Sequence, residues 1–195
     1  MELRGKRVTL RTVDETDLDF LLDFWNNGAN MVQNGWPNGL GIDRAYMDRY
    51  WANISAKMAR TNNPLLRMVV LNEKGERIGE MAMDRIAKGT EYNPAYPVPR
   101  DRMGDMDIKL DHTTRGKGYG TDALRTMLVY GFDALDIDEI IVEPEQSNAG
   151  ALRLYAKLGF MPQGVRYCHK TSTGMDLNCE IWVCHRDDFL AAIRL

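Results

Sequence analysis

The first hundred residues carry short runs of apolar residues that switch between strand-like and helix-like spacing. Alternating apolar and polar positions predict a strand over residues 3–13, and helical spacing predicts a helix over residues 16–26, after Asp14. An Asn- and Gly-rich stretch over residues 26–41 indicates a loop. A second helix is predicted over residues 43–60, on an apolar stripe formed by Ile42, Tyr46, Tyr50 and Ile54.

Beyond residue 65 the pattern becomes an alternation of strands and helices. Strand-like runs at 66–71 and 77–84 flank a polar turn and predict a hairpin. Residues 87–103, with three prolines and no period, indicate a long loop. The remaining pattern predicts a strand at 105–111, a helix at 119–135, a strand at 139–143, a helix at 149–158, and strands at 160–166 and 175–186. This order predicts an α/β fold with a mixed sheet flanked by helices, in one domain spanning residues 1–195.

Composition and charge exclude several classes of function. The net charge of −3 provides no concentrated basic face, so no nucleic-acid partner is expected. No apolar run approaches the roughly 18–20 residues of a membrane helix, and the N-terminus lacks the apolar core of a secretory signal. Three cysteines without a CxxC spacing and three scattered histidines indicate neither a disulfide framework nor a metal site. We therefore expect a cytoplasmic protein that contacts no membrane and binds no metal.

A glycine-rich hexapeptide, RGKGYG at Arg115–Gly120, lies between a predicted strand and a predicted helix. Its glycines allow a tight turn whose backbone N–H groups point into one small volume. The helix N-terminus adds partial positive charge, and together these features suit a pyrophosphate. The spacing fits neither the dinucleotide fingerprint GxGxxG nor the phosphate loop GxxxxGK[ST]. A strand-to-helix turn without a ligand is the alternative.

Two blocks of the sequence resemble the GCN5-related N-acetyltransferase (GNAT) family. Arg115–Gly120, followed by TDALRTMLVYGF, resembles the acetyl-CoA motif of that family. Asn148–Phe160, NAGALRLYAKLGF, resembles the family segment N-x-x-A-x-x-L-Y-x-K-x-G-F. The detailed resemblance covers about residues 105–166. It implies a single GNAT domain that uses acetyl-CoA as acyl donor, with an acceptor-side half over residues 1–100 and an acetyl-CoA-binding half over residues 104–186.

The resemblance also implies which residues contact the cofactor. The pantetheine amides would pair with backbone at Ile108, Lys109 and Leu110, as if adding a strand. Asn148, a favoured helix N-cap residue, often contacts the cofactor in this family. The phosphates would be held by backbone N–H groups of Arg115, Gly116, Lys117, Gly118, Tyr119 and Gly120.

Three side chains are candidates for the chemistry. Tyr155 lies seven residues after Asn148, about two helical turns or roughly 10 Å, so both share one helix face. The resemblance assigns its hydroxyl to the sulfur of coenzyme A as general acid, and a core tyrosine is the alternative. Glu143 is a candidate base because ribosomal-protein N-terminal acetyltransferases of the family have a matching glutamate. Asp107, between apolar neighbours, is a second candidate carboxylate.

The predicted activity is acetyl transfer to a primary amine by direct attack in a ternary complex. The acceptor is a small molecule, an aminoglycoside-like amine or a protein N-terminus, and Pro144 departs from the N-terminal-acetylating pattern in favour of a small amine. An acyl-CoA-binding sensor without catalysis is the alternative, and the choice of base stays open. Dimers are common in this family, so a homodimer is one expectation. An acceptor wall could come from the aromatic residues Trp25, Trp36, Tyr46, Tyr50 and Trp51.

Overall fold

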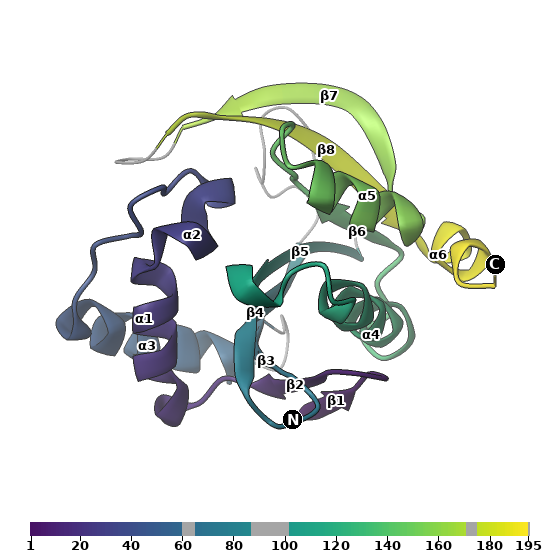
Figure 1. The fold of residues 1–195 in the computed structure, drawn as a ribbon. Helices are drawn as coiled ribbons and strands as arrows, with labels where there is room; N and C mark the ends of the chain where they lie inside the picture. The colour runs from purple at the N-terminus through teal and green to yellow at the C-terminus, as the bar shows by residue number, and fades with distance from the viewer. Residues whose placement is uncertain (60–64, 87–101, 171–174, 195) are drawn as a thin grey trace. The chain divides into compact units, whose positions relative to one another are not determined.

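A computed structural model describes residues 1–59, 65–86, 102–170 and 175–194 (Figure 1). Most of the predicted 87–103 loop lies outside these ranges. The chain divides into two compact units, and each is described by itself. The first unit comprises Met1–Asp84 and Asp107–Thr126, and the second comprises Arg85–Met106 and Met127–Leu195.

The described helices and strands follow the predicted α/β order. The elements up to the first long hairpin are β1 Glu2–Arg4, β2 Thr9–Thr12, α1 Leu18–Asn26, α2 Gly28–Met31, α3 Arg44–Met58, β3 Leu65–Leu71 and β4 Arg77–Ile86. The later elements are β5 Met103–Leu110, α4 Tyr119–Asp133, β6 Glu139–Val142, α5 Ala149–Lys157, β7 Met161–His169, β8 Leu177–His185 and α6 Arg186–Ala192. The boundary between the units passes through β4, β5 and α4.

Among the described residues, eight strands form one mixed sheet in the order β1-β2-β3-β4-β5-β6-β8-β7. In the first unit, the strands β1 to β4 each pair antiparallel with the next strand along the chain. In the second unit, β5 pairs parallel with β6 over Met103–Asp105, and β6 and β7 both pair antiparallel with β8. The parallel pair of β5 and β6, in a sheet that also contains antiparallel pairs, confirms the predicted mixed sheet.

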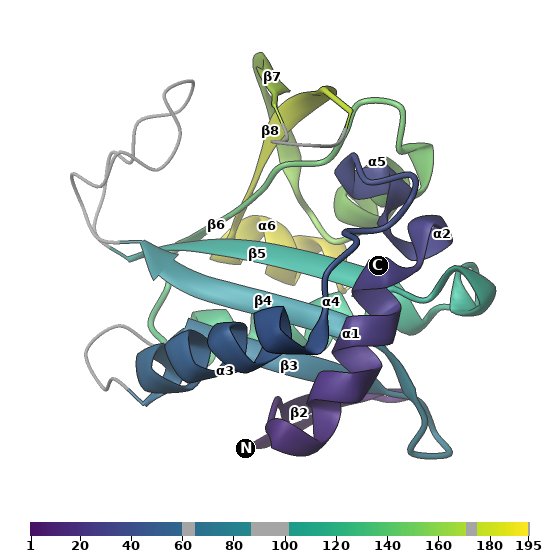
Figure 2. The same cartoon turned by 90° about the vertical axis from the view of Figure 1, so that its left-hand side faces the viewer.

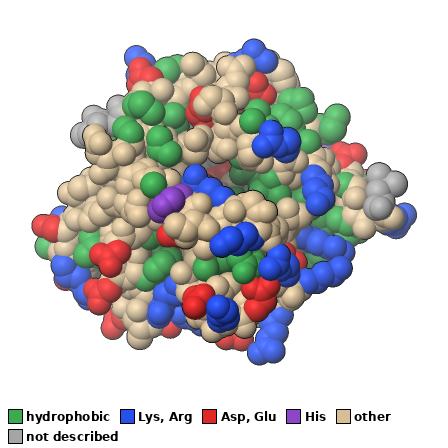
Figure 3. Space-filling model, viewed as in Figure 1, with side chains coloured by type: hydrophobic (Ala, Val, Ile, Leu, Met, Phe, Trp, Pro, Cys, Tyr) green, Lys and Arg blue, Asp and Glu red, His purple; other side chains and the backbone are tan. Residues whose placement is uncertain are grey.

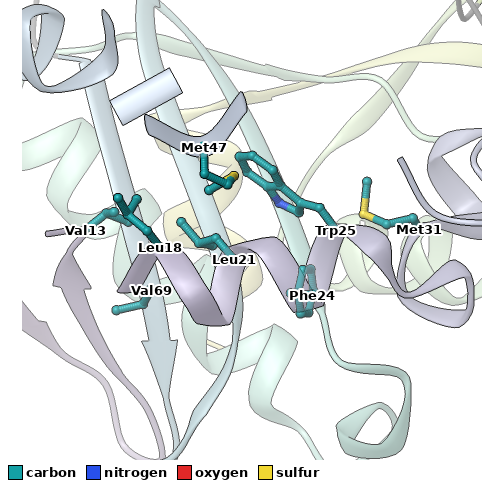
Figure 4. Close-up of a cluster of buried hydrophobic side chains, with 8 residues drawn as sticks. All are labelled: Val13, Leu18, Leu21, Phe24, Trp25, Met31, Met47 and Val69. Carbon is teal, nitrogen blue, oxygen red and sulfur yellow. The ribbon is translucent and has the colours of Figure 1, made fainter. Parts of the chain in front are cut away.

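The core of the first unit lies where α1 and α3 cover one side of β2, β3 and β4 (Figure 2). Asp14 caps the turn that leads into α1. Its side chain accepts a hydrogen bond from the backbone N–H of Thr16, and it forms a capping box with Asp17. The apolar face of α1 then points into the cluster shown in Figure 4, formed by Val13, Leu18, Leu21, Phe24, Trp25, Met31, Met47 and Val69. These buried side chains hold α1 against the strands.

Three local predictions for the first unit are wrong. The single strand over residues 3–13 is a hairpin, since Gly5 donates its N–H to the carbonyl of Val8 and turns the chain. The predicted loop over residues 26–41 contains the short helix α2. The predicted stripe on α3 is right at Ile54, which is buried, and at Ile42 and Tyr50, which pack on the core, but it is wrong at Tyr46, which is 43% exposed, and it omits the buried Met47. Asp43 caps α3, because its side chain accepts a hydrogen bond from the backbone N–H of Tyr46.

The second unit has its own apolar core. The cluster is formed by Ile86, Met103, Ile141, Ile181 and Val183. The pattern missed α6, a helix of seven residues that the Phe132–Phe189 ring contact holds in place. In the described residues no helix is both long and apolar enough to cross a membrane.

Candidate functional site

The glycine-rich turn has the backbone shape that its sequence predicted. Gly116 and Gly118 adopt φ of 74° and 85°, in the region that side chains with a Cβ rarely enter. A Cβ on Gly116 would meet nothing within 4 Å, so that side of the turn is open. Tyr119 then begins α4. This shape fits a turn whose N–H groups receive an anion at the start of a helix.

The turn between β1 and β2 fastens the start of α4, a contact the sequence patterns did not reveal. The carboxylate of Asp122 accepts from the backbone N–H groups of Lys6, Arg7 and Val8 at 3.1, 2.6 and 3.0 Å. The Arg7 guanidinium donates to the carbonyl of Lys117 and lies 4.7 Å from the ring centroid of Tyr119. These contacts fix the outer side of the glycine-rich turn within the first unit.

Arg115 uses its side chain for structure. The guanidinium donates to the carbonyls of Leu110 at 3.2 Å and Asn30 at 3.0 Å. Asn30 is itself buried, and its side-chain oxygen accepts from the backbone N of His112 at 2.9 Å. The side chain of Arg115 therefore ties α2 to the segment that precedes the turn. The predicted contribution of Arg115 to phosphate binding is that of its backbone N–H alone.

The predicted pantetheine strand is the second half of β5. The ladder between β5 and β6 covers Met103–Asp105 and so ends before Ile108, Lys109 and Leu110. On its other side β5 packs closely on β4, because a Cβ on Gly79 would lie 2.2 Å from the carbonyl oxygen of Lys109. Only glycine permits that approach.

A cluster of charged side chains, the Glu80 cluster, lies on β4 and β5 beneath α1 and α3. The Nζ of Lys109 forms an ion pair with Asp107 and lies 3.6 Å from Oε1 of Glu80. Trp25 on α1 donates its indole N–H to Glu80 at 2.6 Å. The Glu80 and Lys109 side chains are 11% and 16% exposed, whereas that of Asp107 is 46% exposed. The cluster therefore reaches solvent mainly through Asp107.

Electrostatics in the Glu80 cluster favour the charged form of its lysine. Burial alone lowers the pKa of Lys109, but the charges of Asp107 and Glu80 outweigh burial and raise that pKa above its usual range. Burial, and then the charge of Glu80, raise the pKa of Tyr50 to about 12. Tyr50 packs edge-on against Trp25 with ring centroids 5.0 Å apart. A neutral tyrosine thus covers an ionised lysine and its carboxylates.

Sequence patterns did not single out Glu80. The available signal was a carboxylate on the strand R-I-G-E-M-A-M-D, between two residues that are buried. A buried carboxylate at such a position needs partners, and here they are an indole and an ammonium. Asp107, a predicted catalytic carboxylate, shares the ammonium of Lys109 with Glu80, a carboxylate of the same unit, and its catalytic role stays a prediction.

The other predicted residues lie in the second unit. Asn148 caps α5, because its side-chain oxygen accepts from the backbone N of Ala151 at 3.1 Å, as expected. Tyr155 is buried on α5, with its ring 5.3 Å from that of Phe160. Glu143 follows the last residue of β6 and is half-buried. Burial and then the charge of Glu143 raise the pKa of Cys179 to about 11. The catalytic roles of these side chains stay predictions.

Charged groups of both signs are spread over the face of the molecule drawn in Figure 3. Figure 3 shows acidic and basic side chains interspersed with apolar ones on one face. Within the described ranges, no three or more His, Cys, Asp and Glu side chains are grouped so that they could hold a metal ion.

Known proteins are similar to this chain over most of its length. The profile of the family described as "Acetyltransferase (GNAT) domain" matches residues 7–161. An N-acetyltransferase 9-like protein of Caenorhabditis elegans is 27% identical over 139 residues, which cover 69% of this chain and 65% of that protein. An aminoglycoside N(6')-acetyltransferase type 1 of Klebsiella pneumoniae is 29% identical over 161 residues, 80% of this chain and 75% of that protein.

A solved structure supports the same fold. Spermidine N-acetyltransferase from Vibrio cholerae, in complex with CoA and spermine, superposes with a TM-score of 0.73 and 19% identity. The superposition covers 94% of this chain and 98% of that one. The two sequence motifs, the mixed sheet and these matches confirm the predicted family resemblance and the predicted α/β fold.

Proposed function

The chain belongs to the acetyltransferase (GNAT) domain family, and we propose that it transfers the acetyl group of acetyl-CoA to a primary amine of a small molecule. The family confirms the predicted enzyme class and acetyl-CoA as acyl donor. The acceptor is the proposed part. Relatives of this chain are named for acetylating small amines, among them the aminoglycoside of the Klebsiella pneumoniae protein.

The Glu80 cluster is the observation that carries the choice of acceptor. Two carboxylates, Glu80 and Asp107, share one ammonium, Lys109, so these three side chains together carry one negative charge in excess. Asp107 presents part of that charge to solvent. An amine is protonated near neutral pH, and an excess carboxylate next to the proposed pantetheine strand attracts it and can later accept its proton.

The proposed reaction needs no covalent enzyme intermediate. The amine nitrogen forms a bond to the thioester carbonyl carbon, and the carbon–sulfur bond then breaks. A carboxylate, Asp107 or Glu143, takes the proton of the amine directly or through water. Tyr155 donates its hydroxyl proton to the departing sulfur. The turn Arg115–Gly120, with backbone at Ile108–Leu110 and the cap residue Asn148, holds the acyl donor in place, and that positioning supplies much of the rate.

The family resemblance also suggests a location and an assembly state for the enzyme. We place the enzyme in the cytoplasm and propose a homodimer, as the family resemblance suggests. The acceptor could instead be a protein N-terminus, which Glu143 favours and Pro144 disfavours. A non-catalytic acyl-CoA sensor is the alternative function, and it predicts binding of acetyl-CoA without turnover.

An acceptor screen tests the proposal. Purified protein and acetyl-CoA are incubated with hexylamine, 1,6-diaminohexane, spermidine, an aminoglycoside and a peptide with a free N-terminus. Thiol release gives the rate, and mass spectrometry identifies a product heavier by one acetyl group. We expect acetylation of at least one small amine at a higher kcat/KM than of the peptide. Saturable acetyl-CoA binding with no product from any amine would instead support the sensor.

Tyr155→Phe tests the proposed general acid. Loss of the hydroxyl should lower kcat by about 100-fold, the lower range for general acid–base catalysis, while acetyl-CoA affinity stays nearly unchanged. Tyr130→Phe, which removes a hydroxyl from α4, serves as the matched control and should retain wild-type kcat. Wild-type turnover in Tyr155→Phe would remove Tyr155 from the mechanism.

A further inference from the structure

The Glu80 cluster contains a cation that neither phosphate binding nor proton transfer uses. Lys109 lies on β5 beside Ile108, whose backbone is the proposed partner of pantetheine. The long side chain of Lys109 is mostly buried, although lysine is rarely buried unless paired. Its Nζ lies between Glu80 on β4 and Asp107 on β5. Lys109 therefore places a positive charge next to two carboxylates at the proposed acceptor site.

The surrounding groups leave the charge balance of this position well defined. Arg67 on β3 is paired with Asp84, at 3.1 Å, so that pair adds no net charge. Tyr50 on α3 is neutral at physiological pH, since burial and Glu80 raise its pKa to about 12. Trp25 donates an uncharged N–H. Two carboxylates and one ammonium thus leave one negative charge for a ligand, among the residues that the structure describes.

We infer that Lys109 is a specificity-determining residue, a built-in cation that occupies the place of a second ammonium group and so favours acceptors with a single amine. Without Lys109 the cluster would present two carboxylates, a match for a diamine that binds with both ends charged. With Lys109 in place, a second ammonium on the acceptor meets a like charge instead. This inference rests on the proposed amine acetylation and names the class of amine.

The direction of the effect follows from the geometry. The ammonium of Lys109 is close enough to contact both carboxylates, so removing it changes the potential at both of them. Charges a few Å apart near a protein surface interact strongly enough that one charge can change relative affinity by about tenfold or more. The change should be visible only when acceptors that differ in the number of amines are compared.

The test compares hexylamine with 1,6-diaminohexane, which have the same carbon chain and differ by one amino group. The measured quantity is the ratio of kcat/KM for the diamine to kcat/KM for the monoamine. Any effect of a variant on folding or on the shared chemistry cancels in this ratio. In Lys109→Met we expect the ratio to rise by about tenfold, because the charge is removed and the length of the side chain is kept. Lys74→Met, in the exposed β3–β4 turn, is the control and should leave the ratio at the wild-type value.

A second variant keeps the test decisive if Lys109→Met folds poorly. Lys109→Met combined with Glu80→Gln has one carboxylate and no lysine, so it restores a single negative charge. Its ratio should return to the wild-type value. A ratio that is unchanged in Lys109→Met, or equally raised in the double variant, overturns the inference and leaves amine acetylation intact. A wild-type protein that binds acetyl-CoA but acetylates neither amine overturns the proposed function, and the inference with it.

Discussion

Two buried carboxylates of the first unit, Asp17 and Glu80, are neutralised in different ways. Asp17 is fully buried and accepts from Arg11 at 2.6 Å and from Arg77 at 2.7 Å, as well as from the backbone N of Asp14. Glu80 is 9% exposed and accepts one indole N–H, while it shares a single ammonium 3.6 Å away with another carboxylate. Asp17 thus contacts two guanidinium groups, whereas the ammonium that Glu80 contacts is shared with Asp107.

The difference separates a structural charge from one available to a ligand. The pairs around Asp17 join β2 and β4 to the start of α1, and Asp14 balances the second guanidinium. That arrangement is complete without a ligand. The cluster around Glu80 has one unbalanced negative charge and a half-exposed member, Asp107, which is the arrangement expected where a cation is to bind. Substitution of Asp17 should therefore lower stability more than activity, and substitution of Glu80 should lower activity more than stability.

The largest effect on stability is expected for Asp17→Asn. The substitution leaves two guanidinium groups without their buried counter-ion, which should lower the free energy of unfolding by about 3 kcal/mol. The isosteric change at the other carboxylate, Glu80→Gln, should cost about 1 kcal/mol, because the amide oxygen still accepts from Trp25 and Lys109 keeps Asp107. Urea unfolding of both variants, followed by tryptophan fluorescence, measures the two losses.

The two variants should differ in activity in the reverse order. At a temperature where both are folded, Asp17→Asn should keep the wild-type kcat/KM, whereas Glu80→Gln should lower it for amines. Equal stability losses, or a lower kcat/KM in Asp17→Asn alone, would show that the division into structural and ligand-binding carboxylates is wrong.

A smaller effect is expected at alkaline pH, and it belongs to the Glu80 cluster. Tyr50 in the unfolded chain loses its proton near pH 10, while the folded protein holds it to about pH 12. Between these values the unfolded state binds fewer protons, so stability falls as pH rises. Tyr50→Phe should remove about 1 kcal/mol of the fall between pH 9 and pH 11. Urea unfolding at both pH values checks this, and declines of equal size in the two proteins would contradict the pKa argument.

The sequence was most informative where local chemistry decides the structure. Positive φ at Gly116 and Gly118 and the cap at Asn148 follow from backbone and capping preferences of one residue type each. These preferences act over a few residues, so they can be seen in a single sequence. The glycine-rich turn and the second motif could therefore be identified without a structure.

The remainder depends on contacts between distant residues. Glu80 and Lys109 are 29 positions apart, and nothing in the spacing of either strand shows that they meet. The hydrogen bond between the backbone N–H of Arg7 and the carboxylate of Asp122, near the glycine-rich turn, joins residues 115 positions apart. On α3 the periodicity was right for a helix and for most of its buried face, but tertiary packing buries Met47 and leaves Tyr46 exposed. Such pairings are set by strand register, which hydrophobic patterns do not specify across a sheet.

Binding of acetyl-CoA at Arg115–Gly120 can be tested by isothermal titration of acetyl-CoA into Gly118→Glu. Gly118 has φ of 85°, and the substitution places a carboxylate where phosphates are proposed to bind. Gly164→Glu, at a glycine of φ 70° on β7, imposes the same strain and charge elsewhere and serves as control. We predict saturable binding to the wild type and to Gly164→Glu, and no measurable binding to Gly118→Glu. An unchanged dissociation constant in folded Gly118→Glu would contradict the assignment of the turn.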